Sequence, residues 1–247
     1  MKRFPAELED LLSPRGRRAL AGRDRLCGLL AQGLRYVSAD DLLKPQLARA
    51  ALALLERTMR ANLTEMNVPI PESALRGMKR SYTERLPKAV RVRTALMASA
   101  RSRASQRAQE IGLTQMLRSD SFHALAESVS GFRLRQKRGT QVLCYDANGY
   151  TGPHNDHHPE DADARAGYTD LHFSFTTPAV DHQLLVYEHG GHLGQVQRIT
   201  APGFFSCYRL PLWHYTTPLA AKPGHLQDAR RWVLLGTFLD EASATRR

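Results

Sequence analysis

The spacing of hydrophobic residues along this chain changes near residue 131. Before that point, apolar residues recur every three or four positions over 44–66, which is the spacing of one face of an α-helix. The residues on that face are Leu47, Ala51, Leu54, Leu55, Thr58 and Met59. Asp40 or Asp41 can cap this helix, and Pro45 is tolerated in its first turn because the amide that proline lacks would be unpaired there. The pattern therefore predicts a helix over 44–66.

Residues that break or cap helices divide the rest of the first half. They are Pro69, Pro71, Ser73, Pro87, Ser119, Asp120 and Gly131. The first two prolines end the predicted helix, and Ser73 can cap a second one. Pro87 separates that helix from the region 88–117, and a last helix is expected from Ser119 or Asp120 to Gly131. We expect residues 1–130 to form a helical region.

After residue 131 the pattern is that of short β-strands. Runs of aromatic, β-branched and alternating apolar residues are separated by Gly, Pro, Asn and Asp. These runs cover 132–135, 140–145, 171–176, 183–187, 195–200, 204–208, 213–217 and 232–239. Many short strands without helices between them are typical of a sandwich or jelly roll. The sequence predicts an α+β protein in which the helical region 1–130 packs on a β core formed by 131–247.

Composition limits the class of protein. With 247 residues and 42% hydrophobic content, the chain can bury a sizeable core. No stretch has the length and apolar character of a membrane span or a signal peptide, and the three cysteines form no close pair. We expect a cytoplasmic protein without membrane association.

The positive charge of the chain is concentrated in its first half. The net charge is +11, and residues 1–130 hold 23 Lys and Arg against 13 Asp and Glu. The densest basic run covers 76–118. Such a patch can bind nucleic acid, but a solvated helix face is the interpretation we favour, because Tyr82 is the only aromatic residue in the run that could stack on bases.

The most informative motif is His154-Asn155-Asp156, followed downstream by His214. In an extended strand, His154 and Asp156 would project from one face and Asn155 from the other. With His214 as a third ligand, they would form the facial triad of two histidines and one carboxylate that binds non-haem Fe(II) and leaves positions open for a co-substrate and O₂. A structural zinc site would instead use thiolates and close its fourth position.

Arg231 provides a second candidate site residue. It leads the run 231–238, whose continuous apolar character predicts a buried strand. A buried arginine needs an anionic partner, and its planar donor fork matches a carboxylate. Arg231 would therefore bind the far carboxylate of 2-oxoglutarate, while the keto-acid end chelates the metal.

Residues 131–240 resemble the prolyl-hydroxylase-like branch of the 2-oxoglutarate- and Fe(II)-dependent dioxygenases, both in the type of these motifs and in their order along the chain. The resemblance includes Tyr145, which lies nine residues before His154. It matches a tyrosine of the family that often helps to hold the 2-oxoglutarate carboxylate. The resemblance also includes 201–208, before the distal histidine, and the closing segment 231–240. Two features differ from the family pattern: Asp181-His182 replaces a usual Gly-Gly, and an inserted loop over 219–229 places Arg231 far beyond His214.

The resemblance implies a double-stranded β-helix (jelly roll) core with Fe(II) and 2-oxoglutarate as cofactors. It also implies oxidative decarboxylation of 2-oxoglutarate to succinate and CO₂, coupled to hydroxylation of a substrate by O₂. Asp156 favours hydroxylation, because related halogenases have a small residue at that position. Thr237 and Gly236 occupy the places where relatives that demethylate nucleic acids have a second arginine.

The substrate stays open at the level of sequence, because the pocket walls of this fold vary freely. The leading hypothesis is hydroxylation of an amino-acid or peptidyl side chain, and a small-molecule natural product is an alternative. A second alternative is a cupin-like metal enzyme that uses His154, His158 and His214 without 2-oxoglutarate. A third is a basic nucleic-acid-binding protein whose barrel is inactive.

Overall fold

The structure, a computed structural model, describes residues 1–70, 72–75, 89–97, 101–156, 167–199 and 201–241. Helices are concentrated before residue 131: α1 (Pro14–Leu20), α2 (Pro45–Thr58), α3 (Glu72–Leu75), α5 (Arg103–Glu110), α6 (Leu113–Leu117) and α7 (Asp120–Ser130), with 3₁₀ turns at Leu8–Leu11 and Arg60–Asn62. Strands β1 to β3 are Tyr36–Ala39, Thr64–Pro69 and Ala89–Leu96. The later strands are β4 (Leu134–Asp146), β5 (Tyr150–His154), β6 (Tyr168–Thr176), β7 (Val180–His189), β8 (His192–Ile199), β9 (Phe204–Leu210), β10 (His214–Thr216), β11 (Ala220–Ala221) and β12 (Arg230–Asp240).

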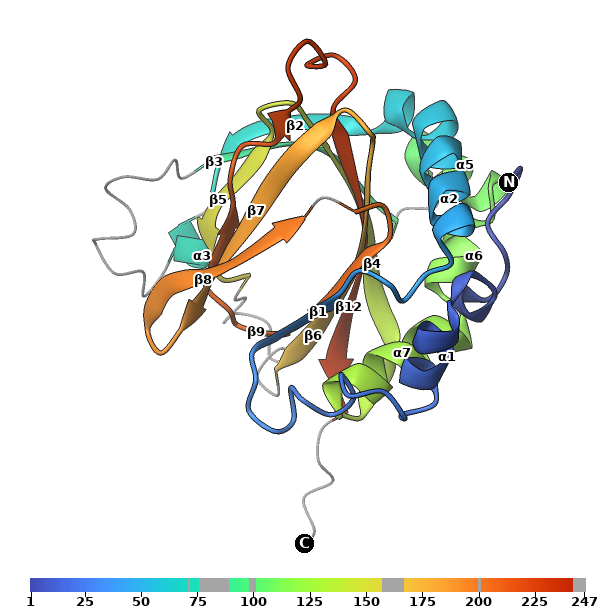
Figure 1. Ribbon diagram of the computed structural model, residues 1–247, viewed down its shortest axis with the longest axis vertical. Helices are drawn as coiled ribbons and strands as arrows, with labels where there is room; N and C mark the ends of the chain where they lie inside the picture. The colour runs from blue at the N-terminus through green and yellow to red at the C-terminus, as the bar shows by residue number, and fades with distance from the viewer. Residues whose placement is uncertain (71, 76–88, 98–100, 157–166, 200, 242–247) are drawn as a thin grey trace, which may run out of the picture.

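All of these strands belong to one antiparallel sheet that curls on itself (Figure 1). Its strand order is β1-β9-β6-β12-β4-β3-β5-β10-β7-β11, with β2 pairing β3 and β8 pairing β7. The curl brings β5, β7 and β10 opposite β4, β6, β9 and β12, and residues from both groups line one central cavity. The predicted jelly-roll core with an α+β composition is confirmed.

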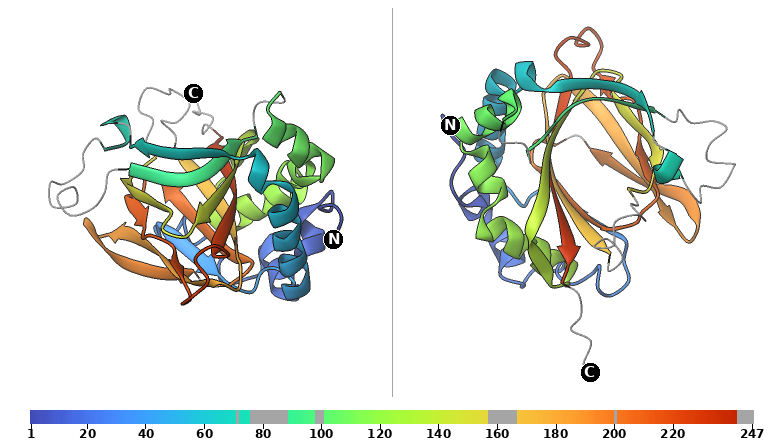
Figure 2. Two further views of the ribbon diagram at one scale, coloured as in Figure 1. Left: turned by 90° about the horizontal axis from the view of Figure 1, so that it is seen from above. Right: turned by 180° about the vertical axis from the view of Figure 1, so that it is seen from behind.

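Helices α1, α2, α5, α6 and α7 lie together on one side of the sheet, where they cover β4, β6 and β12, whereas the short α3 lies on the other side and contacts β5 (Figures 1 and 2). Along β4, β6 and β12, alternate residues face the helices and form the main hydrophobic core. Its largest fully buried members from helix α7 and the sheet are Phe122, Phe173, Phe175, Phe205, Trp232 and Phe238. The intervening residues face the cavity, so the period-2 alternation of the strands separates the core from the candidate site.

The predicted ends of α7 are confirmed. The hydroxyl of Ser119 accepts a hydrogen bond from the amide of Phe122, which satisfies a free donor of the first turn. Gly131 ends the helix with φ 76°, in the left-handed region that glycine adopts at little cost. A Cβ at this position would also meet the backbone of Gly28 at 2.8 Å.

Three strands come from the part of the chain for which we expected helices. The helix predicted over 44–66 ends at Thr58, and β2 begins at Thr64. The region 88–117 contains β3, in which Arg91 and Arg93 alternate with the buried Val92 and Thr94. That alternation is the strand period, and β3 gains partners in β2, β4 and β5 that local sequence does not reveal. The division of the chain into a helical region 1–130 and a β core 131–247 stays a prediction. Strands β1 and β3 from the first region pair with strands of the second.

Two differences concern the second half. The run predicted over 140–145 and the end of the run predicted over 132–135 belong to the single strand β4, which begins at Leu134, and β5 was not predicted as a separate strand. The expected inserted loop over 219–229 contains the two-residue strand β11, which pairs with β7. Among the described helices, none is long and apolar enough to cross a lipid bilayer. The cytoplasmic location stays a prediction.

Gly236 is a point of close contact between the sheet and α7. A Cβ at this position would lie 2.5 Å from Cε1 of Phe122 and 3.0 Å from Cε2 of Phe238. Both rings are fully buried, so they cannot move aside freely. Gly236→Ala is expected to reduce the free energy of unfolding by about 1–3 kcal/mol, the usual cost of overpacking.

Urea denaturation followed by far-UV circular dichroism measures this cost. Gly194→Ala on β8 is the matched control, because a Cβ there has no neighbour within 4 Å in the described part of the chain. It should change the free energy of unfolding by less than about 0.5 kcal/mol. Equal stability of the two variants would show that Phe122 does not restrict position 236.

Candidate metal centre

The fold brings His154, Asp156 and His214 together in the central cavity. Strand pairing places His214, the first residue of β10, directly opposite His154, the last residue of β5. Nε2 of His154 lies 3.4 Å from Oδ1 of Asp156, and Nε2 of His214 lies 3.7 Å from Oδ2 of the same carboxylate. One potential ligand atom from each residue lies within 4.8 Å of the others. Two imidazoles and a carboxylate at this spacing form a set that can hold a divalent metal ion.

Asp156 reaches this position in a different way from the one expected. We expected His154 and Asp156 to share one face of an extended strand. Instead, β5 ends at His154, and Asp156 has φ 52°, in the left-handed region. Asp and Asn adopt that conformation more readily than other residues with a side chain. A turn after the strand, and not the pleat, therefore directs the carboxylate toward the two imidazoles.

Hydrogen bonds fix the orientation of both imidazoles. Nδ1 of His154 lies 2.8 Å from the carbonyl oxygen of Gly152, and Nδ1 of His214 lies 2.8 Å from that of Leu212. A carbonyl can only accept, so each Nδ1 carries the hydrogen and donates it. In the neutral ring the lone pair is then on Nε2, which faces Asp156 in both residues. This arrangement orients metal-binding histidines.

The three side chains shift one another's proton affinity. Burial opposes the charge on His154, but the carboxylate of Asp156 outweighs it and raises the pKa of His154. Burial likewise opposes the charge on Asp156, and the attraction of the histidines outweighs it, so the pKa of Asp156 is well below its usual range. Burial, together with the charge of His154, lowers the pKa of His214 to about 4. Before a metal binds, the proton of the group therefore resides on His154.

Metal binding should consequently depend on pH through His154. A metal ion must displace the proton from this imidazole, so affinity is expected to fall as the pH falls through the raised pKa of His154. His214, with a pKa of about 4, is already neutral over that range. Calorimetric titration with Mn²⁺ in two buffers of different ionisation enthalpy should show release of about one proton near pH 6 and almost none at alkaline pH. Binding without proton release near pH 6 would contradict the assigned proton position.

Arg231 lies in the same cavity and is 4% exposed. Its Nε and Nη2 donate to Oγ of Ser174 at 3.2 and 3.0 Å, and its Nη1 donates to Oε1 of Gln183 at 2.9 Å. Within the described residues no carboxylate forms an ion pair with it, and burial lowers its pKa. A buried cation with neutral partners alone carries a desolvation cost of several kcal/mol. An anionic group of a ligand could therefore bind favourably at the end of the cavity that contains Arg231.

Tyr145 adjoins Arg231, as the predicted site requires. The two residues are paired across β4 and β12, and the guanidinium carbon lies 5.3 Å from the centre of the tyrosine ring. The hydroxyl of Tyr145 lies 2.9 Å from that of Thr151. Like Arg231, Tyr145 lines the cavity, whose volume is about 400 Å³. The five predicted site residues, His154, Asp156, His214, Arg231 and Tyr145, therefore meet in one cavity, and their individual roles stay predictions.

Several residues of the cavity were not predicted from the sequence. Strand β6 contributes Asp170 and His172, and β9 contributes Tyr208, whose hydroxyl lies 3.2 Å from Nε2 of His172. A signal for the β6 residues was present, because they alternate with the apolar Leu171, Phe173 and Phe175. Polar residues at every second position of an otherwise buried strand indicate a polar cavity on one face.

Two sequence-based hypotheses involve residues outside the described part of the chain. His158, the alternative ligand of a cupin-like site, is among them, as are the acidic residues at 160–163. Lys79, Arg80, Arg85 and Lys88 of the basic run are also outside it. Among the described members of that run, Arg93 pairs with Asp146 and Glu65, and Arg107 pairs with Glu110. Nucleic-acid binding through this region stays a prediction that we do not favour.

Comparison with known proteins places the fold. No protein-family model and no curated protein matches the chain. Among solved structures, a Pseudomonas putida prolyl-4-hydroxylase is 14% identical with a TM-score of 0.50, over 88% of this chain and 100% of that one. An oxidoreductase of the 2OG-Fe(II) oxygenase family from Burkholderia pseudomallei is 14% identical with a TM-score of 0.53, over 89% and 92%. A Trichoplax adhaerens prolyl hydroxylase, solved with a peptide of hypoxia inducible factor, is 11% identical with a TM-score of 0.52, over 92% and 90%. The chain thus has the fold of the 2-oxoglutarate- and Fe(II)-dependent oxygenases, including its prolyl hydroxylases.

Proposed function

We propose that this protein is an Fe(II)- and 2-oxoglutarate-dependent oxygenase that hydroxylates an amino-acid or peptidyl side chain. One observation carries the proposal: a group of two histidines and one aspartate shares a cavity with a buried arginine that has no anionic partner among the described residues. The three ligands leave other metal positions open for a chelating co-substrate and O₂. The arginine matches the free carboxylate of a keto-diacid.

Different residues of the cavity would bind the metal ion and the co-substrate. Nε2 of His154, Nε2 of His214 and the carboxylate of Asp156 would hold Fe(II). Bound Fe(II) and 2-oxoglutarate supply the oxidising chemistry, in which 2-oxoglutarate and O₂ yield succinate, CO₂ and a hydroxylated substrate. Arg231 would bind the distal carboxylate of 2-oxoglutarate, and Ser174 and Gln183 hold the guanidinium in place. Tyr145 covers the guanidinium and offers its hydroxyl as a neutral donor.

The apolar walls of the cavity support the same chemistry. Val92, Leu185, Leu210, Val233 and other hydrophobic side chains surround the polar groups. They exclude water, which strengthens the pairing of Arg231 with a carboxylate and protects a reactive site from side reactions. The choice of an amino-acid or peptidyl substrate follows the prolyl hydroxylases among the similar structures, one of them solved with a peptide.

Oxidation of a small natural product is the second candidate. A non-haem α-ketoglutarate-dependent carbocyclase from nogalamycin biosynthesis, SnoK, has a TM-score of 0.52 to this chain, at 13% identity and over 96% of this chain and 87% of that one. A cavity of about 400 Å³ accommodates a compact ligand of either kind. The cupin-like alternative, in contrast, gives no role to the buried guanidinium of Arg231.

Anaerobic binding of Fe(II) and 2-oxoglutarate tests the proposal. The chelate should give a weak visible charge-transfer band in the wild type, and His154→Ala should lose it. Admission of O₂ with a suitable substrate should then release succinate. Absence of the band from the wild type, or its persistence in His154→Ala, would overturn the assigned site.

A further inference from the structure

The cavity contains a second buried ionisable group that the proposed chemistry does not use. Asp170, on β6, is 4% exposed and lines the same cavity as the metal-binding group. Its Oδ2 lies 3.6 Å from Nε2 of His172. Its Oδ1 is buried and has no hydrogen-bond partner among the described residues. A buried carboxylate with an unsatisfied oxygen carries a desolvation cost that a cation bound beside it can offset.

Strand β6 fixes where Asp170 lies relative to the other groups. Ser174, His172 and Asp170 occupy alternate positions of the strand, about 7 Å apart from one to the next. Of these, His172 and Asp170 line the cavity. Ser174 accepts hydrogen bonds from Arg231. His172 contacts Tyr208, whose ring centre lies 5.2 Å from that of His214. From Ser174 to Asp170, strand β6 therefore runs from the anion-binding end of the cavity, past the metal-binding group, to the position of Asp170.

Arg231 is not the counter-ion of Asp170. In the pairing of β6 with β12, Asp170 is opposite Thr237, whereas Arg231 is opposite Thr176. Six residues along a strand separate the two positions by roughly 20 Å. Burial raises the pKa of Asp170 and outweighs the opposing effects of His172 and Thr237, and the charge of Asp156 adds to the rise. A cationic ligand would counter the effects of burial and of Asp156, because it replaces lost hydration and compensates the second carboxylate.

We infer that Asp170 is the specificity-determining residue of this cavity, and that the substrate carries an ammonium or guanidinium group that pairs with the carboxylate of Asp170. The inference rests on the proposed oxygenase function and names its substrate class. Arg231 would hold the co-substrate at one end, and Asp170 would hold the cationic group of the substrate beyond the metal. Leu210 and Leu235 line the cavity as well and suit an aliphatic segment.

Matched pairs of small probes test this inference. N-acetyl-lysine amide and N-acetyl-arginine amide carry a side-chain cation, and N-acetyl-norleucine amide and N-acetyl-citrulline amide are their neutral counterparts. Free leucine against N-acetyl-leucine tests an α-ammonium group in the same way. A hydrogen bond to a charged group contributes about 1.5–3 kcal/mol, so in at least one pair the cationic member should stimulate succinate release about 10- to 100-fold more than its counterpart.

Asp170→Asn should reduce that preference to within about twofold, because asparagine keeps the shape of the side chain and removes its charge. The variant should retain the charge-transfer band with Fe(II) and 2-oxoglutarate. As an apoprotein it should unfold at the wild-type temperature or above, because the substitution removes a buried carboxylate. If cationic and neutral probes stimulate succinate release by the wild type equally, the inference is overturned. It is also overturned if no cationic probe stimulates succinate release. An unchanged preference in Asp170→Asn overturns it as well. Absence of the band from the wild type refutes the oxygenase function itself, so the two failures are distinguishable.

Discussion

Arg231→Gln is expected to raise the 2-oxoglutarate concentration required for half-maximal succinate release by about 100- to 1,000-fold. Removal of one member of a buried charge pair costs about 2–5 kcal/mol of binding free energy, and about 1.4 kcal/mol corresponds to a factor of ten. Glutamine can still hydrogen bond to Ser174, so the effect isolates the charge and the donor fork. Direct titration of 2-oxoglutarate into the anaerobic Fe(II) protein, followed by the charge-transfer band, measures the loss.

The same substitution should have the opposite effect on the apoprotein. Because the guanidinium is 4% exposed and has no carboxylate partner among the described residues, its removal eliminates a desolvation cost. Arg231→Gln without ligands should therefore be no less stable than the wild type in thermal unfolding. A clear loss of stability would show that Arg231 has a structural role.

Arg230→Gln is the matched control. Arg230 neighbours Arg231 on β12 but points away from the cavity, and its Nε donates to Oε2 of Glu56 at 2.6 Å. Its loss should destabilise the fold and leave the half-saturating 2-oxoglutarate concentration within about twofold of the wild type. If both arginine variants weakened 2-oxoglutarate equally, general damage to β12 would explain the result.

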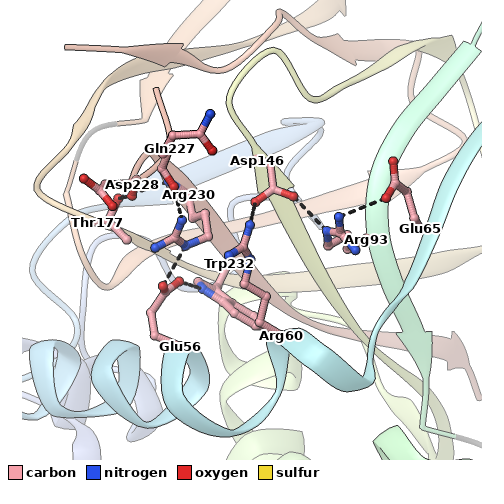
Figure 3. Close-up of polar contacts among 10 residues, drawn as sticks. All are labelled: Glu56, Arg60, Glu65, Arg93, Asp146, Thr177, Gln227, Asp228, Arg230 and Trp232. Carbon is pink, nitrogen blue, oxygen red and sulfur yellow. Dashed lines mark hydrogen bonds and ion pairs between the residues drawn. The ribbon is translucent and has the colours of Figure 1, made fainter. Parts of the chain in front are cut away.

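Glu56→Ala is expected to lower the free energy of unfolding by about 2–4 kcal/mol, since it leaves two donors without their acceptor. Glu56 lies on α2 and accepts hydrogen bonds from Arg230 and from the indole of Trp232, which is fully buried (Figure 3). This contact joins α2 to the strand that carries Arg231. Chemical denaturation of the purified variant measures the change.

Glu65→Ala provides the comparison for this effect. Glu65 also accepts from an arginine, Arg93, at 2.9 Å (Figure 3), but its side chain is 60% exposed. Exposed ion pairs contribute little, so the variant should lose no more than about 1 kcal/mol. If Glu56→Ala were as mild as Glu65→Ala, the contact between α2 and β12 would not contribute to stability as we argue.

Local patterns in the sequence predicted the elements whose determinants are themselves local. The helix between Ser119 and Gly131 was predicted at both ends, because its capping groups are neighbours of the turns that they cap. Strands such as β6, β9 and β12 were predicted from their apolar runs. Strand β3 was not, since it is stabilised by pairing with β4 and β5, which lie far away in the chain: Val90 is opposite Thr151.

By itself the sequence determined the chemistry that this protein can contain: two imidazoles, a carboxylate and a guanidinium, in an order that resembles one oxygenase family. Only the tertiary structure decided how they meet. Sheet curling places His214 opposite His154, a turn and not a strand directs Asp156 toward them, and the alternation of β6 adds Asp170 to the same cavity. The reason is physical: ligand distances, burial and missing counter-ions arise from contacts between residues far apart in the chain, and no local pattern records them.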